Sequence, residues 1–173
     1  MCETKGVQMA EIGNPEKLFQ HELGTALGAE RKVLATLRKL EQRAQQEELK
    51  QQFHHHLGET EGQIQNLEQA LKASGAPEGA HEAESANGIA AEGEKMMEKV
   101  DDDLIDAVLL AAAAKTEHVE IAMYEGLITK AEAIGADDIV ALLEENLDQE
   151  RHTLEEVKKV AKKLSKELAS QTA

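Results

Sequence analysis

Aromatic residues, proline and cysteine are scarce in this sequence, and each shortage narrows the class of protein. There is no Trp, one Tyr and two Phe among 173 residues. With only two Pro and few β-branched residues, the composition is dominated by Ala, Leu, Glu, Lys and Gln, which favour helices and predict an all-α protein. The single cysteine, Cys2, allows no disulfide within the chain and suits a reducing compartment.

Long apolar runs and an excess of basic charge are lacking as well. No run approaches the roughly 18 apolar residues of a membrane span, and no charged-then-apolar signal segment is present, so we expect a cytoplasmic protein. The 34 acidic and 19 basic residues give a formal net charge of −15. Because phosphates require a basic patch, this balance disfavours nucleic acid and membranes as partners. Most of the acidic charge is expected to lie on solvated helix surfaces.

The apolar periodicity predicts four long helices. Residues 1–14 are polar without clear periodicity, and they predict a flexible N-terminus before one helical domain over 15–168. The helices are expected over residues 15–43, 47–73, about 104–135 and 138–168, with a short helix within 80–99. Two short joints and the long crossing between them predict a ferritin-like four-helix bundle with a long crossover carrying a short extra helix.

Several single residues support these boundaries. Asn14 before Pro15 is typical of a helix start, and Gly75 and Gly135 are placed as helix ends. Asp137 is expected to cap the last helix. In the first helix Gly24 and Gly28 would allow another element to approach closely.

Each long helix carries an acidic or imidazole residue at the midpoint of an otherwise apolar stripe. These residues are Glu30, His56, Glu59, Glu117, Glu120 and Glu150. Midpoints of bundle helices lie at similar heights, so we expect the side chains to converge in the core. Buried carboxylates are costly unless they are paired, protonated or bound to metal. Two divalent ions would neutralise most of this charge, and carboxylates with one imidazole suit iron or manganese.

The expected roles of these residues differ. Glu59 and Glu150, or Glu117, would bridge the two metals, while Glu30 and Glu120 would be terminal ligands and His56 the nitrogen ligand. The order His56-x-x-Glu59 reverses the usual Glu-x-x-His pattern of di-metal bundles. A purely structural polar layer is the alternative, with its carboxylates hydrogen-bonded or partly protonated.

Neighbouring polar residues are expected to play no direct part. In the last helix Thr153, not His152, lies one turn after Glu150. We expect His152 to lie beside the site or on the surface. His21, His54 and His55 are expected to be solvated.

Four segments of the chain resemble, in order, segments of the YciF-type stress protein family. They are Ala29-Glu30-Arg31-Lys32 with Leu34, His56 to Ile64, Asp106 to Tyr124, and Leu142 to Glu150. The resemblance covers roughly residues 16–160. It implies a ferritin-like bundle, often dimeric, in bacteria, associated with stress responses and with a di-metal centre. The family has no established biochemical activity. Leu27 and Thr25 stand where it often has a tyrosine and an aspartate, so the resemblance does not extend to a redox relay beside Glu30.

Composition, spacing and resemblance together predict a cytoplasmic bacterial protein with a carboxylate-rich di-metal site. It would bind iron or manganese, react with oxygen or peroxide as a small oxidant, and form a homodimer. The alternative is a non-enzymatic helical stress protein that acts through dimerisation or partner binding. Iron storage is the weakest hypothesis, because storage requires a closed cage of many subunits.

Overall fold

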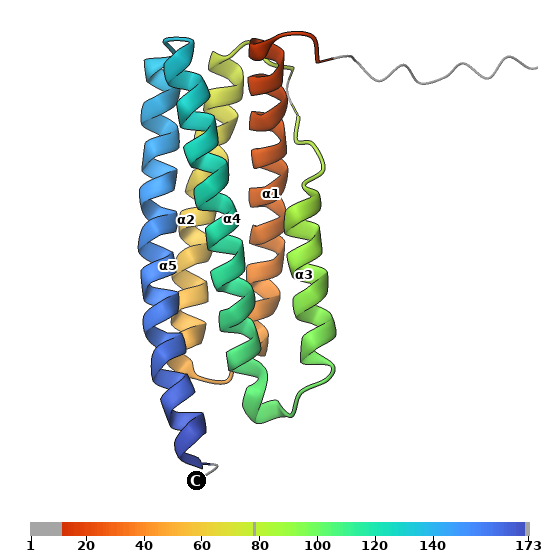
Figure 1. The fold of residues 1–173 in the computed structure, drawn as a ribbon, viewed down its shortest axis with the longest axis vertical. Helices are drawn as coiled ribbons and strands as arrows, with labels where there is room; N and C mark the ends of the chain where they lie inside the picture. Colours follow the sequence, from red (N-terminus) through yellow and green to blue (C-terminus); the bar gives the residue numbers. More distant parts are fainter. Residues whose placement is uncertain (1–11, 78, 172–173) are drawn as a thin grey trace, which may run out of the picture.

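Four long helices lie side by side, with a fifth, shorter helix against their outside (Figure 1). This computed structural model describes residues 12–77 and 79–171, and within these ranges all regular structure is helical. The elements are α1 Pro15–Arg43, α2 Glu47–Ala73, α3 Glu84–Met97, the 3-10 turn η1 Asp102–Leu104, α4 Ile105–Ala133 and α5 Asp137–Gln171. Cys2 and most of the predicted flexible N-terminus, residues 1–11, lie outside the described residues.

The connections confirm the predicted topology. Helices α1 and α2 form one hairpin and α4 and α5 a second, each joined by a three-residue connection. The crossover between the hairpins carries α3, which packs against α4 and α1. As a result α2 and α4 run in the same direction, as a ferritin-like bundle requires (Figure 1). None of the described helices is long and apolar enough to cross a membrane.

Most helix ends follow the sequence signals. The Asn14 side chain accepts a hydrogen bond from the Lys17 amide at 2.8 Å. Gly75 and Gly135, with φ of 69° and 70°, end α2 and α4 in the left-handed conformation that glycine favours. The prediction that Asp137 caps the last helix is wrong. Ala136 holds that position, and Asp137 lies in the first turn, where the helix dipole favours a carboxylate.

A buried aspartate fastens the first hairpin to the second. Asp106, in the first turn of α4, is 4% exposed. Its two carboxylate oxygens accept hydrogen bonds from the amides of Gln45 and Gln46, at 2.8 and 2.9 Å. These amides precede α2, whose N-cap residue Gln46 makes no side-chain cap of its own. Asp106 therefore holds the backbone just before α2 from across the fold.

The crossover passes α1 at Gly24 and Gly28, where the sequence predicts that another element could approach closely. The His81 amide donates to the Gly24 carbonyl at 2.8 Å, and the His81 ring stacks on His21 with centroids 4.4 Å apart. A Cβ atom on Gly28 would lie 1.8 Å from the His81 carbonyl oxygen. Only glycine at this position lets the crossover lie so close to the helix.

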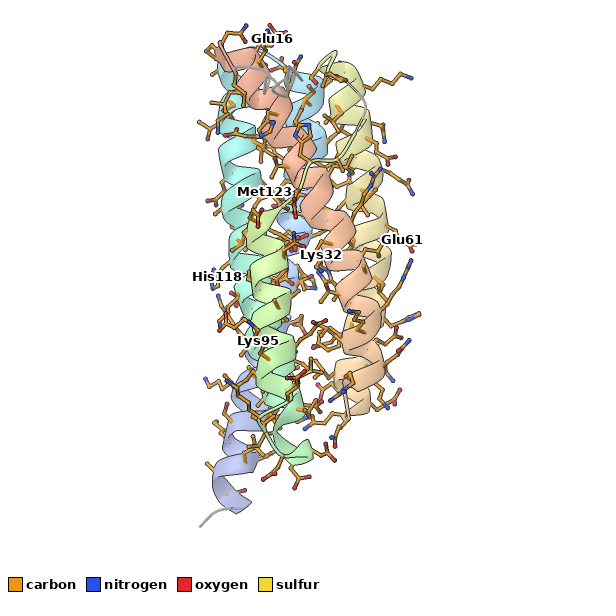
Figure 2. The ribbon with its side chains drawn as sticks, turned by 90° about the vertical axis from the view of Figure 1, so that its right-hand side faces the viewer. Glu16, Lys32, Glu61, Lys95, His118 and Met123 are labelled. Carbon is orange, nitrogen blue, oxygen red and sulfur yellow. The ribbon has the colours of Figure 1, made fainter. Side chains whose placement is uncertain are left out.

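Helix α3 packs loosely against the bundle. Ala86 is its only buried residue, while Ile89 and Met97 are half-buried. Met96 is 44% exposed, although the apolar spacing of the sequence places it on the same side as Ile89 and Met97. The helix lies over the seam between α1 and α4 instead of entering the core (Figure 2).

The bundle core is split into two apolar clusters. One includes Phe19, Leu27 and Leu147, and the other includes Val33 and Val157. On α1 and α5 the residues between these clusters include buried carboxylates. The polar layer expected from the helix midpoints therefore lies between two hydrophobic halves.

Candidate metal centre

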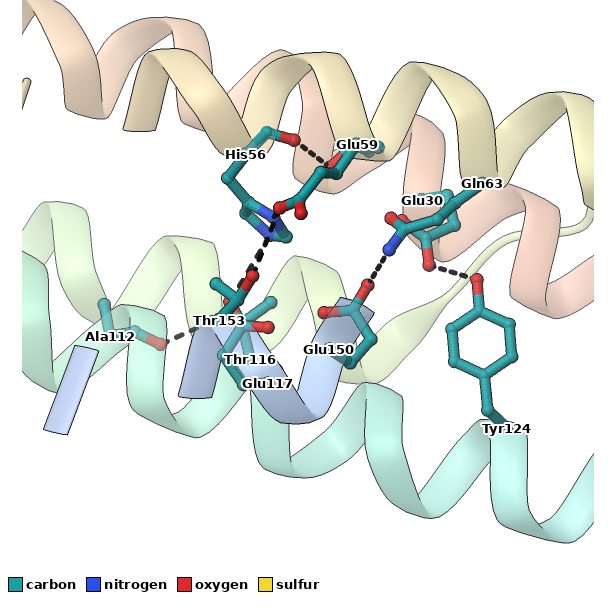
Figure 3. A network of polar contacts seen from close by, with 11 residues as sticks. Glu30, His56, Glu59, Gln63, Ala112, Thr116, Glu117, Tyr124, Glu150 and Thr153 are labelled. Atoms are coloured by element: carbon teal, nitrogen blue, oxygen red, sulfur yellow. Dashed lines mark hydrogen bonds and ion pairs between the residues drawn. The ribbon is translucent and has the colours of Figure 1, made fainter. Parts of the chain in front are cut away.

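Five of the six predicted ligands meet in this layer (Figure 3 draws four of them). Glu30 comes from α1, His56 from α2, Glu117 and Glu120 from α4, and Glu150 from α5, and none is more than 4% exposed. His56 and the three glutamates of α4 and α5 each offer one ligand atom, and these four atoms lie within 4.8 Å of one another. Residues three apart on α4 share a face, which brings both of its glutamates to this point.

Glu30 lies next to the four-residue cluster and is held by a tyrosine. The Tyr124 hydroxyl, fully buried, donates to Glu30 Oε1 at 2.5 Å (Figure 3). Glu30 is close enough to His56 and Glu117 for their charges to act on its pKa. Asn146 in turn donates to the Tyr124 hydroxyl oxygen at 3.0 Å. One carboxylate oxygen of Glu30 is thereby fixed in orientation.

Glu150 has a fixed oxygen as well. The Gln63 amide donates to Glu150 Oε1 at 2.5 Å, and Asn146 donates to the Gln63 backbone carbonyl at 3.2 Å. Gln63, Tyr124 and Asn146 are residues of the candidate site that could not be singled out from their residue types alone. Their signal was their place on the same inward stripes as the glutamates, because Tyr124 lies four residues after Glu120 and Asn146 four residues before Glu150.

Glu59 is the predicted ligand that the structure leaves outside the cluster. Helix α2 turns Thr60 and Gln63 inward, each fully buried, so Glu59 lies at the edge with its side chain 16% exposed. Glu59 Oε2 is 3.3 Å from His56 Nδ1 and accepts a hydrogen bond from Thr153 at 3.3 Å. A carboxylate on the outer nitrogen of an imidazole fixes the ring and its tautomer when the other nitrogen binds a metal.

The centre of the layer contains buried polar atoms that have no hydrogen-bond partner. They are Glu30 Oε2, His56 Nε2, Gln63 Oε1, Glu117 Oε2, both carboxylate oxygens of Glu120, and Glu150 Oε2. His56 Nε2 is 3.4 Å from Glu117 Oε1, an ion-pair distance without hydrogen-bond geometry. Buried polar groups in proteins are nearly always satisfied, so a converging set of unsatisfied oxygens with one imidazole nitrogen matches the donors of a metal site.

Burial and crowding change the acidity of these groups. Burial raises the pKa of Glu30 to about 7, against the hydrogen bond from Tyr124, which lowers it. Burial and neighbouring carboxylates raise the pKa values of Glu120 and Glu150 well above their usual range. Burial alone would lower the pKa of His56, but contacts with Glu117 and Glu59 outweigh it and raise the pKa to about 10. Without a metal, the layer therefore contains protonated carboxyl groups beside a charged imidazole.

Comparisons with known proteins agree with this architecture. The family described as a domain of unknown function (DUF892) matches residues 14–170. Protein YciF of Escherichia coli is 36% identical over 140 residues, which cover 80% of this chain and 84% of YciF. The crystal structure of that stress protein superimposes with a TM-score of 0.83 at 33% identity, covering 88% of this chain and 98% of YciF.

Two further solved structures share the fold. YcfI of Rhodopseudomonas palustris, described as a candidate structural protein, matches with a TM-score of 0.83 at 32% identity and covers 86% of this chain and 96% of its own. A protein of Xanthomonas campestris matches with a TM-score of 0.74 over 92% of this chain and 99% of its own, at 18% identity, and so supports the fold alone.

Proposed function

This chain belongs to the DUF892 family and is a relative of YciF, and we propose that it is a bacterial stress-response protein with a carboxylate-rich di-metal centre. The metals would be iron or manganese, and the centre would react with oxygen or peroxide. The observation that supports this proposal best is the set of unpartnered, buried donor atoms that four helices bring together.

The donor set fits two divalent ions by charge and by chemistry. Four buried carboxylates, those of Glu30, Glu117, Glu120 and Glu150, carry four negative charges when ionised, which two divalent ions would balance. Carboxylate oxygens with one imidazole suit iron and manganese better than thiolate-preferring metals. His56, Glu117, Glu120 and Glu150 would hold one ion between them, and Glu30 would add a carboxylate on the Tyr124 side.

The surrounding residues would position these ligands. Bound iron or manganese would supply the redox chemistry toward oxygen or peroxide. Glu59 would hold the His56 ring through Nδ1, leaving Nε2 facing the cluster. Tyr124 and Gln63 would each fix one oxygen of a carboxylate. Glu120, with neither oxygen hydrogen-bonded, would be the ligand most able to reorient as the charge of the centre changes.

Metal content is the first experiment. Protein purified without chelators and loaded anaerobically with Fe²⁺ or Mn²⁺ should retain about two ions per chain by elemental analysis after gel filtration. Glu117→Ala should lose this metal, while Glu132→Ala, an exposed position on the same helix, should retain it. Glu59→Ala should weaken binding by about 10- to 100-fold without abolishing it, because Glu59 acts through His56. A wild-type protein that binds no metal would refute the proposal.

A structural polar layer is the second candidate function. The observation in its favour is a continuous chain of hydrogen bonds across the layer, in which Asn66 donates to Asn146, Asn146 to Tyr124, and Tyr124 to Glu30. The protein would then act through dimerisation or partner binding, and metal would not change its melting temperature. We also propose that the protein is a homodimer, which a light-scattering mass of twice the chain mass would support and a monomer mass would contradict.

A further inference from the structure

A cavity of 390 Å³ lies beneath α3, in the half of the bundle that contains the α1–α2 connection. Most of its wall is apolar and includes Val33, Leu37, Phe53, Ala113 and Val157, from four different helices. Exposed residues such as Gln51 and His55 also line the cavity, so it is partly open to solvent. A volume of 390 Å³ falls within the range of sites that bind small molecules.

One part of this cavity wall is formed by the candidate metal centre. His56 and Glu117 line the cavity, and each has a buried atom without a hydrogen-bond partner, Nε2 and Oε2. Gln52, one turn before His56 on α2, also lines it and has a buried Oε1 without a partner. The cavity thus combines a long aliphatic wall with a few convergent polar atoms. A ligand that fits it should likewise have a long apolar part and one polar end.

The charge around the polar part disfavours an acidic ligand. Besides Glu117, the carboxylates of Glu59 and Glu156 line the cavity. Of the two lysines in the lining, Lys39 is already paired with Glu94 at 3.0 Å. The charged His56 imidazole is already paired with Glu59 and Glu117, at 3.3 and 3.4 Å, so a carboxylate or phosphate end group would lose its hydration beside these carboxylates without gaining a free cation. An uncharged hydroxyl, which can both donate and accept hydrogen bonds, avoids that cost.

Helix α3 forms one side of the cavity. It covers the seam between α1 and α4, with the Lys32 side chain beside it (Figure 2). Ion pairs to its neighbours, such as Lys115–Glu92 at 2.6 Å, are solvent-exposed and so contribute little stability. With Ala86 as its only buried residue, α3 is expected to move more easily than the four core helices.

We propose that this cavity binds an elongated aliphatic molecule with an uncharged polar end group, such as a primary alcohol. The end group lies beside His56 and Gln52, and the aliphatic chain extends beneath α3. Binding itself does not depend on metal. Only the consequence that this end group faces the di-metal centre as a substrate rests on the proposed function.

The test uses 1-octanol, titrated into the full-length, metal-free protein in an isothermal calorimeter. We expect saturable binding to one site per chain with a negative heat-capacity change, because apolar surface is buried. Octanoate should bind at least about tenfold more weakly than 1-octanol, since its charge must be desolvated beside carboxylates. Ala113→Phe places a ring in the cavity and should weaken 1-octanol binding by about tenfold or more. Ala122→Phe, at an exposed position on the same helix, should bind as the wild type does.

Ala90→Phe repeats the test on α3, outside the bundle core, so the result does not depend on whether Ala113→Phe folds. No binding of 1-octanol by the folded wild type, or unchanged binding by Ala90→Phe, would overturn the proposal. Tighter binding of octylamine than of 1-octanol would overturn the uncharged end group. Because metal-free protein is used, a negative metal analysis would refute the proposed function and leave this result standing.

Discussion

Replacing Glu120 by methionine should stabilise the metal-free protein and at the same time abolish its metal binding. Glu120 is 2% exposed, and neither of its carboxylate oxygens has a hydrogen-bond partner. Methionine has a similar length and no group that requires a hydrogen bond. The substitution would also remove the repulsion between Glu120 and Glu150, whose pKa is raised first by burial and then by the charge of Glu120.

The size of the effect follows from the burial of an unsatisfied group. A buried polar group without a partner costs about 1–3 kcal/mol, and replacing buried ionic groups by apolar ones of similar volume has gained about 1–4 kcal/mol. We therefore expect a gain of about 2 kcal/mol, or roughly 4–8 °C in melting temperature for a chain of this size. With metal at 100 times its Kd, the wild type would gain about 3 kcal/mol and Glu120→Met would gain nothing.

Thermal unfolding followed by circular dichroism, with chelator and then with Mn²⁺, measures both effects. Glu132→Met, at an exposed position on α4, is the matched control and should change the free energy of unfolding by less than about 0.5 kcal/mol. A metal-free Glu120→Met protein that melts below the wild type would show that Glu120 is satisfied in the native layer, and it would refute the reasoning.

Three further predictions concern acidity, packing and the hydrogen bonds of Asp106. In chelator the melting temperature should fall steadily from pH 5 to 9. The pKa of Glu30 is raised to about 7 in the folded protein, so its contribution to stability is lost as the pH rises from the pKa of an unfolded glutamate to about 7. The pKa of His56 is raised to about 10, so its contribution is lost as the pH rises above the pKa of an unfolded histidine. A melting temperature that rises over this range would contradict these shifts. Gly28→Ala should destabilise the protein by about 1–3 kcal/mol, because the new Cβ meets the crossover backbone. Gly62→Ala, which meets nothing within 4 Å, should instead stabilise it by about 0.5–1 kcal/mol, and equal effects in urea unfolding would argue against this contact. Asp106→Ala should cost about 1–3 kcal/mol in urea unfolding, since the amides of Gln45 and Gln46, just before α2, lose their acceptor, and a loss no larger than that of the exposed Asp103→Ala would contradict this role.

The fold could be predicted because its signals are local. Apolar residues at helical spacing define the long helices, and glycines such as Gly75 and Gly135 mark where they end. The lengths of the connections then indicate which helices form hairpins. The contact of Asp106 with the backbone before α2 could not be predicted, because its partners lie about 60 residues away in the sequence and meet it only in the folded bundle.

The accuracy of the predicted site is limited by how well the sequence defines the rotation of each helix about its own axis. On α2, Glu59 and Thr60 differ by about 100° around the axis, and both are compatible with the apolar pattern. Packing against the neighbouring helices turns Thr60 inward and leaves Glu59 at the edge. Tyr124 and Asn146 were missed for another reason. Neutral side chains give no charge signal, and their role appears only when their partners' positions are known.

The scarcity of aromatic residues has a spectroscopic consequence. Tyr124 is the only tyrosine of a chain that has no tryptophan, and its hydroxyl is hydrogen-bonded to Glu30 at the candidate centre. The near-ultraviolet absorbance and emission of the tyrosine type therefore come from one point in the molecule. Ionisation of Glu30, arrival of a paramagnetic ion or separation of the hairpins would each alter that signal. The protein thus contains its own reporter of events at the centre, readable without any label.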